Sequence, residues 1–290
     1  MGYQRQQLRL SLILEPLPGE PLILIIDETG DQKKGETTDY VARQYIGNLG
    51  KVENGIVSVN AYGVVRNTLF PLIFKVGKPQ TTLLAEDIYK TKPQLAIEII
   101  SELKAMGFKI ALVLADSLYG ESSTFIQGLN KLPLKYVVAI RSNHKAWLNK
   151  EEVIYGDWQT FNRVLDNANE QTRFIQQIIC PGSVGARYWK ITSDFLRERK
   201  TNTWYLMTNL PGDLHSSIGN HYGLRNWIEY GFKQAKNERG WADFRVTNYQ
   251  QIEKWWEIVS CAFLQVRLAY RLTREIIKLH TRVLTINPRA

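Results

Sequence analysis

Four polar residues of different chemistry lie within one short segment of the chain: Tyr222, Arg225, Glu229 and Lys236. The segment is rich in helix-compatible residues, and at about 100° per residue the four side chains share an arc of roughly 60° on one helix face. A carboxylate beside a guanidinium and an ammonium suits metal-assisted chemistry on a phosphodiester, because the carboxylate binds the cation while Arg and Lys bind phosphate oxygens. The adjacent apolar stripe that would dock this helix consists of Leu224, Ile228, Phe232 and Ala235.

Such a site needs further carboxylates, because Mg²⁺ prefers oxygen ligands and one helix rarely supplies enough of them. Two short, continuous apolar runs predict buried strands: residues 22–26 lead into Asp27 and residues 110–115 lead into Asp116. If these strands are neighbours in an open sheet, both aspartates project into one cleft, which Glu229 completes. The alternative is that each Asp only begins a turn, which is common for Asp shortly before Gly. The helix pattern favours the cleft.

In these motifs the chain resembles the DDE transposases of bacterial insertion sequences, in the subgroup marked by a Tyr-x2-Arg-x3-Glu-x6-Lys signature. The spacing from Tyr222 to Lys236 matches that signature without a gap. Residues 25–30 and 114–120 resemble the family's first and second Asp motifs, and residues 41–54 also contain familial sequence. The three motifs occur in the expected order, and the resemblance covers residues 20 to 260 approximately.

The resemblance implies metal-dependent hydrolysis of a DNA strand at a transposon end, followed by attack of the freed 3′ hydroxyl on another phosphodiester. It implies two Mg²⁺ ions, with Mn²⁺ as a substitute, and no covalent enzyme intermediate. Nearby acidic residues such as Glu28 and Glu238 fit the pattern less well and are expected to be structural. The residues implied in catalysis and metal binding are Asp27, Asp116 and Glu229. Those implied in DNA binding are Tyr222, Arg225 and Lys236, with Arg and Lys clamping phosphates.

The resemblance also implies a ribonuclease-H-like core of the α/β class, a mixed sheet flanked by helices, and the sequence pattern agrees. Residues 55–65 and 68–76 predict two strands of a meander. Residues 91–106 predict a helix, with Pro93 near its start and Gly107 at its end. Further elements are expected at 123–132 (helix), 135–140 (strand) and 251–278 (long helix). The predicted regions are a leader (1–20), the first part of the core (21–140), a β-rich insertion (141–219), the C-terminal core helices (220–279) and a tail (280–290).

The expected insertion lies between the second Asp and the Glu and contains strand-like runs at 173–180, 186–192 and 203–207. Its tryptophans are either stacking platforms for displaced bases or core residues of the strands. The core interpretation is favoured for most of the set, which is Trp147, Trp158, Trp189 and Trp204. Trp147 is the candidate DNA contact, because polar and basic neighbours surround it.

The composition favours DNA as the partner. The formal net charge is +9, and residues 221–290 carry twelve Lys or Arg against six Asp or Glu. Positive charge beside a carboxylate cluster fits a DNA groove, although a basic balance can also merely aid solubility. Two isolated cysteines, Cys180 and Cys261, argue against a disulfide framework or a zinc site. No stretch predicts a signal peptide or a membrane span, so we expect a cytoplasmic, nucleoid-associated protein without a small-molecule cofactor.

Members of the subgroup carry a helical region before the first Asp that recognises the inverted repeats, whereas 26 residues precede Asp27 here. The resemblance therefore predicts a catalytic core that lacks most of the end-binding region and cannot select transposon ends unaided. Two copies are expected to bridge two ends as a homodimer. The main alternative is a non-catalytic DNA-binding relic or regulator, and a structure-specific nuclease on the same core is a third interpretation. Retention of all three carboxylates favours the transposase.

Overall fold

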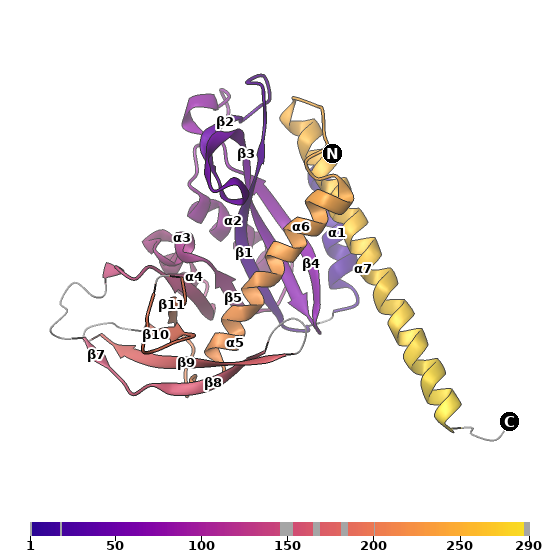
Figure 1. Cartoon of the computed structure of the whole chain (residues 1–290). Coiled ribbons are helices and arrows are strands. Elements are labelled where there is room, and N and C mark those ends of the chain that lie inside the picture. Colours follow the sequence, from indigo (N-terminus) through magenta and orange to yellow (C-terminus); the bar gives the residue numbers. More distant parts are fainter. Residues whose placement is uncertain are drawn as a thin grey trace.

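One mixed sheet runs through the molecule, with helices on its flanks (Figure 1). The computed structural model describes residues 2–17, 19–145, 153–164, 169–180, 185–199 and 201–286. Within them, eleven strands follow the order β2-β3-β1-β5-β6-β11-β10-β9-β7, with β4 paired to β3 and β8 paired to β9. The strands β1, β5 and β6 pair in parallel and the other pairs are antiparallel. The predicted α/β class with a mixed sheet is confirmed.

The first part of the core contains the predicted meander and the predicted helix. Its elements are α1 (Gly2–Leu14), β1 (Leu22–Gln32), β2 (Ala42–Ile46), the 3-10 turn η1 (Gly47–Leu49), β3 (Lys51–Val65), β4 (Thr68–Val76), the 3-10 turn η2 (Gln80–Thr82) and α2 (Lys92–Ala105). Arg66 and Asn67 join β3 to β4 with positive φ at both positions, the geometry of a tight hairpin turn. Helix α2 begins with a capping box at Thr91 and Gln94, and Gly107 follows it with φ 96°.

The parallel part of the sheet comes next along the chain. It consists of β5 (Ile110–Ala115), the short helix α3 (Ser117–Gly120), α4 (Ser123–Lys131) and β6 (Tyr136–Ile140). Buried apolar side chains of β1, β5 and β6 form the centre of the core, among them Ile26, Val113 and Val138. This packing fixes β1 and β5, which position the predicted catalytic aspartates, together with their neighbour β6.

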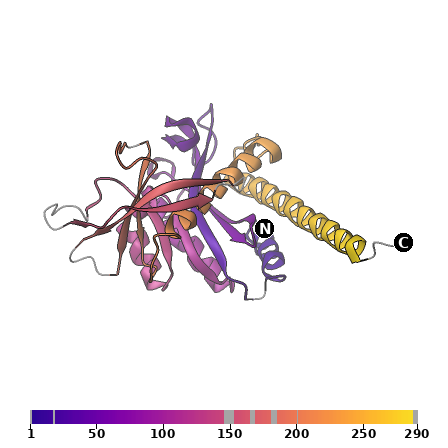
Figure 2. The same ribbon diagram turned by 60° about the horizontal axis from the view of Figure 1, so that its bottom comes forward.

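The region expected to be an insertion continues the core sheet. Its strands are β7 (Ile154–Tyr155), β8 (Gln159–Val164), β9 (Glu170–Ile179), β10 (Arg187–Thr192) and β11 (Thr203–Thr208). Strand β11 pairs antiparallel with β6, and Tyr205 lies opposite Ile140. Figure 2 shows these strands on one side of the core and the last helix on the other. Trp189 is fully buried, as the core interpretation predicted, whereas Trp204 is 37% exposed and Trp147 lies outside the described residues.

The C-terminal segment is α5 (Ile218–Gly223), the 3-10 turn η5 (Leu224–Asn226), α6 (Trp227–Arg239) and α7 (Tyr249–Ile286). The prediction of one regular helix from 222 to 236 was wrong, because the 3-10 turn changes the rotation per residue between Tyr222 and Glu229. Helix α7 crosses α1, where a buried ion pair joins Arg9 and Glu257 at 2.6 Å, and then extends away from the core (Figures 1 and 2). No helix of the described residues has both the length and the apolarity that a bilayer requires.

Candidate active site

The sheet places Asp27 and Asp116 side by side. Strands β1 and β5 are parallel neighbours in which Ile26 lies opposite Ala115, so the next residue of each strand is an aspartate. Strand β5 ends there, as predicted for Asp116. Strand β1 instead continues through polar residues to Gln32, because β3 pairs with it along that whole length. Asp27 therefore lies within a strand rather than at its end, at the level where the parallel partner stops.

Local backbone contacts fix Asp116. Its side chain caps α3 by accepting a hydrogen bond of 2.9 Å from the Leu118 N–H. Helix α3 lies against β6 so closely that a Cβ on Gly120 would lie 1.9 Å from the backbone oxygen of Ala139. Only glycine fits at this contact. The turn that the sequence predicts after Asp116 is thus the short helix α3, and this helix orients the Asp116 carboxylate.

Arg225 links Glu229 to Asp27. The Nη2 atom of Arg225 lies 2.7 Å from Asp27 Oδ2, and its Nη1 atom lies 3.0 Å from Glu229 Oε1. Asp27 is buried, whereas the Glu229 side chain, in the first turn of α6, is 59% exposed. The guanidinium therefore bridges a buried carboxylate of the sheet and an exposed carboxylate of the helix.

The electrostatics of this cluster follow from burial and from the proximity of like charges. The pKa of Asp27 is raised to about 7, chiefly by burial and also by the nearby Asp116 charge, while the Arg225 cation opposes this rise. For Arg225, burial disfavours the charged form, but Asp27, Asp116 and Glu229 outweigh it and raise the pKa above the ordinary value. The two aspartates thus repel each other, and a nearby positive charge stabilises them.

A cavity of about 630 Å³ opens over the cluster. The residues lining it that carry charge include Asp27, Asp116, Arg225, Glu229, Lys233 and Lys236. Two further cavities adjoin Arg225 on the side of strands β8 to β11, with volumes of about 340 and 850 Å³, and Trp204 and Tyr222 line both. Burial raises the pKa of Tyr222, so its hydroxyl stays protonated. The bridging Arg225 therefore lies where three hollows meet.

Lys236 is held by strand β1. Its ammonium donates to the Gly30 carbonyl at 2.6 Å and pairs with Asp31 at 2.9 Å, and the Lys236 and Asp31 side chains are 14% and 5% exposed. Lys233, one turn earlier on α6, is exposed and lines the cavity. Lys233 is not among the site residues predicted from the sequence, although its position four residues after Glu229 places it on the same helix face.

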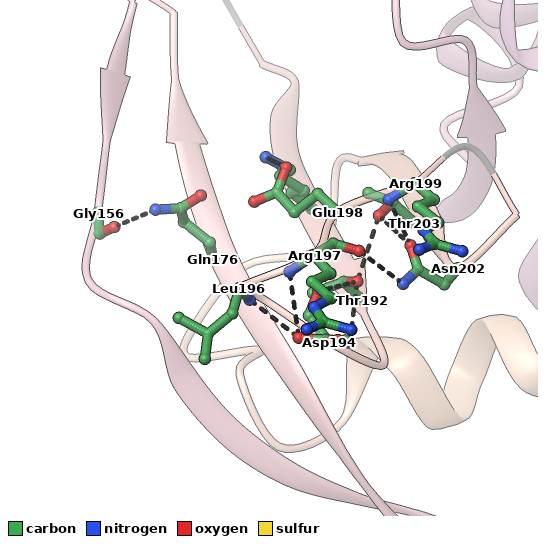
Figure 3. A network of polar contacts seen from close by, with 11 residues as sticks. Gly156, Gln176, Thr192, Asp194, Leu196, Arg197, Glu198, Arg199, Asn202 and Thr203 are labelled. Atoms are coloured by element: carbon green, nitrogen blue, oxygen red, sulfur yellow. Dashed lines mark hydrogen bonds and ion pairs between the residues drawn. The ribbon is translucent and has the colours of Figure 1, made fainter.

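The loop between β10 and β11 brings further charge to the 850 Å³ cavity, which Glu198 and Arg199 line. Figure 3 shows how this loop is braced. The Asp194 carboxylate accepts hydrogen bonds from two backbone N–H groups, at Leu196 and Arg197, and the Asn202 side chain accepts from the Arg199 N–H at 2.7 Å. These side-chain contacts satisfy backbone N–H groups that no strand partner satisfies in this part of the loop.

The donor set fits a hard divalent cation better than any other cofactor. Its possible ligands are carboxylate oxygens, which Mg²⁺ and Mn²⁺ prefer, and the mutual repulsion of Asp27 and Asp116 is relieved by positive charge. In the part of the chain that the structure describes, no group of three or more His, Cys, Asp or Glu side chains is already close enough to hold a metal ion. Glu229 would have to turn from Arg225 toward the aspartates to join them.

Two protein families and one relative match the chain. Residues 3–160 match the family described as DDE superfamily endonuclease, and residues 89–264 match the family described as Transposase DDE domain. A protein of Microchaete diplosiphon described as "Probable transposase for insertion sequence element IS701" is 55% identical over 249 residues. The matched part is 85% of this chain and 65% of the relative, so the chain spans about two thirds of the length of the relative it matches.

Proposed function

The chain belongs to the DDE family of transposases and endonucleases, and from that premise we propose that it cuts DNA strands at the ends of an insertion sequence and transfers the freed 3′ hydroxyl to a new phosphodiester. One observation carries the proposal. Parallel neighbouring strands bring Asp27 and Asp116 together, and Arg225 links Asp27 to Glu229 above them. Three carboxylates that are far apart in sequence thus face one cavity.

Asp27, Asp116 and Glu229 are the residues that we assign to catalysis and to metal binding. They would hold Mg²⁺, with Mn²⁺ as a substitute, in the two-ion arrangement expected for this chemistry. Bound cations of this kind supply activation of the attacking oxygen and stabilisation of the leaving oxygen. Asp27 would be the buried metal ligand, and Glu229 would be the exposed ligand whose side chain can turn toward the metal.

We assign DNA contacts to the cations around the carboxylates. Arg225 has the planar donors that suit a phosphate, and Lys233 presents an ammonium to the same cavity. Lys236 orients α6 on β1 through Asp31, and Tyr222 can donate its protonated hydroxyl to a sugar or phosphate oxygen. On the insertion side, Arg141 and Arg199 line the 850 Å³ cavity with Trp204 and would guide a strand away from the site. Two copies would bridge two ends.

The test is nicking of a supercoiled plasmid in the presence of Mg²⁺ or Mn²⁺. Asp27→Asn, Asp116→Asn and Glu229→Gln are expected to abolish nicking. Glu238→Gln is the matched control, because Glu238 lies on the same helix and its side chain is 57% exposed, close to the 59% of Glu229. Failure of the parent to nick, or equal nicking by the three variants, would refute the catalytic proposal. DNA binding without nicking would instead support the alternative of a non-catalytic DNA-binding transposase relic or regulator.

A further inference from the structure

Strand β2 and the turn η1 form part of the wall of the active-site cavity, although none of the roles above uses them. Tyr45 and Gly47 line the 630 Å³ cavity together with Asp27, Asp116 and Lys233. Tyr45 is 55% exposed, so its ring is accessible to a molecule that enters the cavity.

The neighbours of Tyr45 hold this strand in place. Ile46 is fully buried against two glycines, because a Cβ on Gly30 or Gly55 would approach its side chain to 3.0 Å or 2.6 Å. The Gln44 side chain donates to the Gly55 carbonyl at 2.8 Å, and β2 pairs with β3 over its whole length. Because side chains alternate along a strand, burial of Ile46 turns Tyr45 to the opposite face.

The surroundings of Tyr45 match the chemistry of a nucleic-acid strand. Arg43, two residues earlier on the same face of β2, is exposed, and Lys233 and Arg225 line the cavity with Tyr45. Cations of this kind bind phosphates, while an aromatic face between them takes a nucleobase, whose stacking tolerates any sequence.

We propose that Tyr45 is a DNA-contact residue that stacks on an unpaired nucleobase next to the phosphodiester at the carboxylates. The inference rests on the proposed function, since it takes the cavity to hold a DNA strand. The DNA strand would then be contacted from two sides of the cavity. Helix α6 contacts its phosphates, and strand β2 holds one of its bases. Because stacking is tolerant of sequence, Tyr45 contributes affinity and position rather than the choice of target.

The probe for this inference is a DNA duplex with a short single-stranded 3′ extension that carries 2-aminopurine at successive positions. Stacking on an aromatic ring quenches this base, so wild type, Tyr45→Phe and Tyr45→Trp are expected to quench it at one position of the extension. Tyr45→Ala is expected to lose the quenching and to bind the probe about five- to a hundredfold more weakly in fluorescence anisotropy. Tyr89→Ala is the matched control, because Tyr89 is 44% exposed and belongs to the segment between η2 and α2.

The outcomes separate this inference from the proposed function. If wild type binds the probe and Tyr45→Ala binds and quenches equally well, the inference is overturned while DNA binding stands. If Tyr89→Ala loses as much affinity as Tyr45→Ala, the effect is not specific to the cavity and the inference is again overturned. If wild type does not bind the probe, the proposed function fails first. Unchanged melting temperatures of the variants, expected for exposed side chains, show that folding is intact.

Discussion

The guanidinium of Arg225 lies 2.7 Å from the carboxylate of Asp27, across 198 positions of sequence. It also lies 3.0 Å from Glu229, so one cation pairs with two carboxylates, one from the sheet and one from α6. A divalent cation needs the same oxygens, and Arg225 and the metal must therefore compete or share them.

Arg225→Ala is thus expected to bind Mn²⁺ more tightly than wild type, on the order of tenfold, which corresponds to about 1.4 kcal/mol. The same change is expected to weaken DNA binding, because the phosphate donor is lost. Isothermal titration calorimetry with Mn²⁺ measures the first effect. Arg225→Lys keeps the charge but lacks the planar donors of a guanidinium. Its affinity for Mn²⁺ should lie between the affinities of wild type and Arg225→Ala. Equal or weaker Mn²⁺ binding by Arg225→Ala would show that the guanidinium does not compete.

Asp27→Asn is expected to stabilise the fold, and more so as pH rises. The folded-state pKa of Asp27 is raised to about 7, so the folded state binds its proton more tightly than the unfolded chain. The stability that this proton supplies is complete below the unfolded pKa and is lost as pH rises through about 7. Asparagine removes that loss, and thermal melts at about pH 5 and pH 8 should show a larger gain at pH 8. A gain independent of pH would contradict the pKa of Asp27, and Asp157→Asn, at an exposed position, is the control.

Lys236 and Lys233 are expected to fail in different ways. Lys236→Met leaves Asp31 buried without its cation, at a cost of up to about 3–5 kcal/mol in the free energy of unfolding. Lys233→Ala should change stability by less than about 0.5 kcal/mol, because the side chain is exposed. It should instead lower the slope of log Kd against log salt for DNA by about one. Denaturant unfolding and salt-dependent DNA binding of both variants measure these effects. A loss of stability in Lys233→Ala together with a lower salt slope in Lys236→Met would contradict the roles assigned to the two lysines.

Gly120→Ala is expected to destabilise the protein by at least about 1–3 kcal/mol, because the added Cβ would meet the Ala139 carbonyl at 1.9 Å. The displaced α3 should also turn Asp116 and lower nicking activity. Gly47→Ala is the matched control, since its Cβ would meet nothing within 4 Å. A melting temperature of Gly120→Ala equal to that of wild type would show that α3 and β6 can separate without cost.

The sequence predicts those elements whose signals are local. The apolar run of β5 and the capping residues of α2 determine these elements without reference to the rest of the chain, and both were predicted. Strand β2 was missed, because Arg43, Gln44 and Tyr45 give it no apolar run and its pairing with β3 holds it. The polar end of β1 was missed for the same reason, since β3 supplies the hydrogen bonds.

The candidate site divides in the same way. The adjacency of Asp27 and Asp116 follows once β1 and β5 are neighbours, as the two apolar runs suggested. The partners of Lys236 could not be predicted, because Asp31 belongs to the unpredicted end of β1 and the contact depends on where α6 crosses it. The link between Arg225 and Asp27 likewise depends on the docking of a helix, which no spacing encodes.

The pairing of β6 with β11 has a mechanical consequence for the nucleic acid. Four residue pairs join the two strands, from Tyr205 opposite Ile140 to Thr208 opposite Val137, so one hydrogen-bonded sheet continues across both sides of the candidate site. We therefore expect the two sides to move together when a duplex that contacts both of them reaches the carboxylates. The deformation then falls on the DNA, which favours substrates that bend or unpair easily, such as those with pyrimidine–purine steps or nicks at the cutting position.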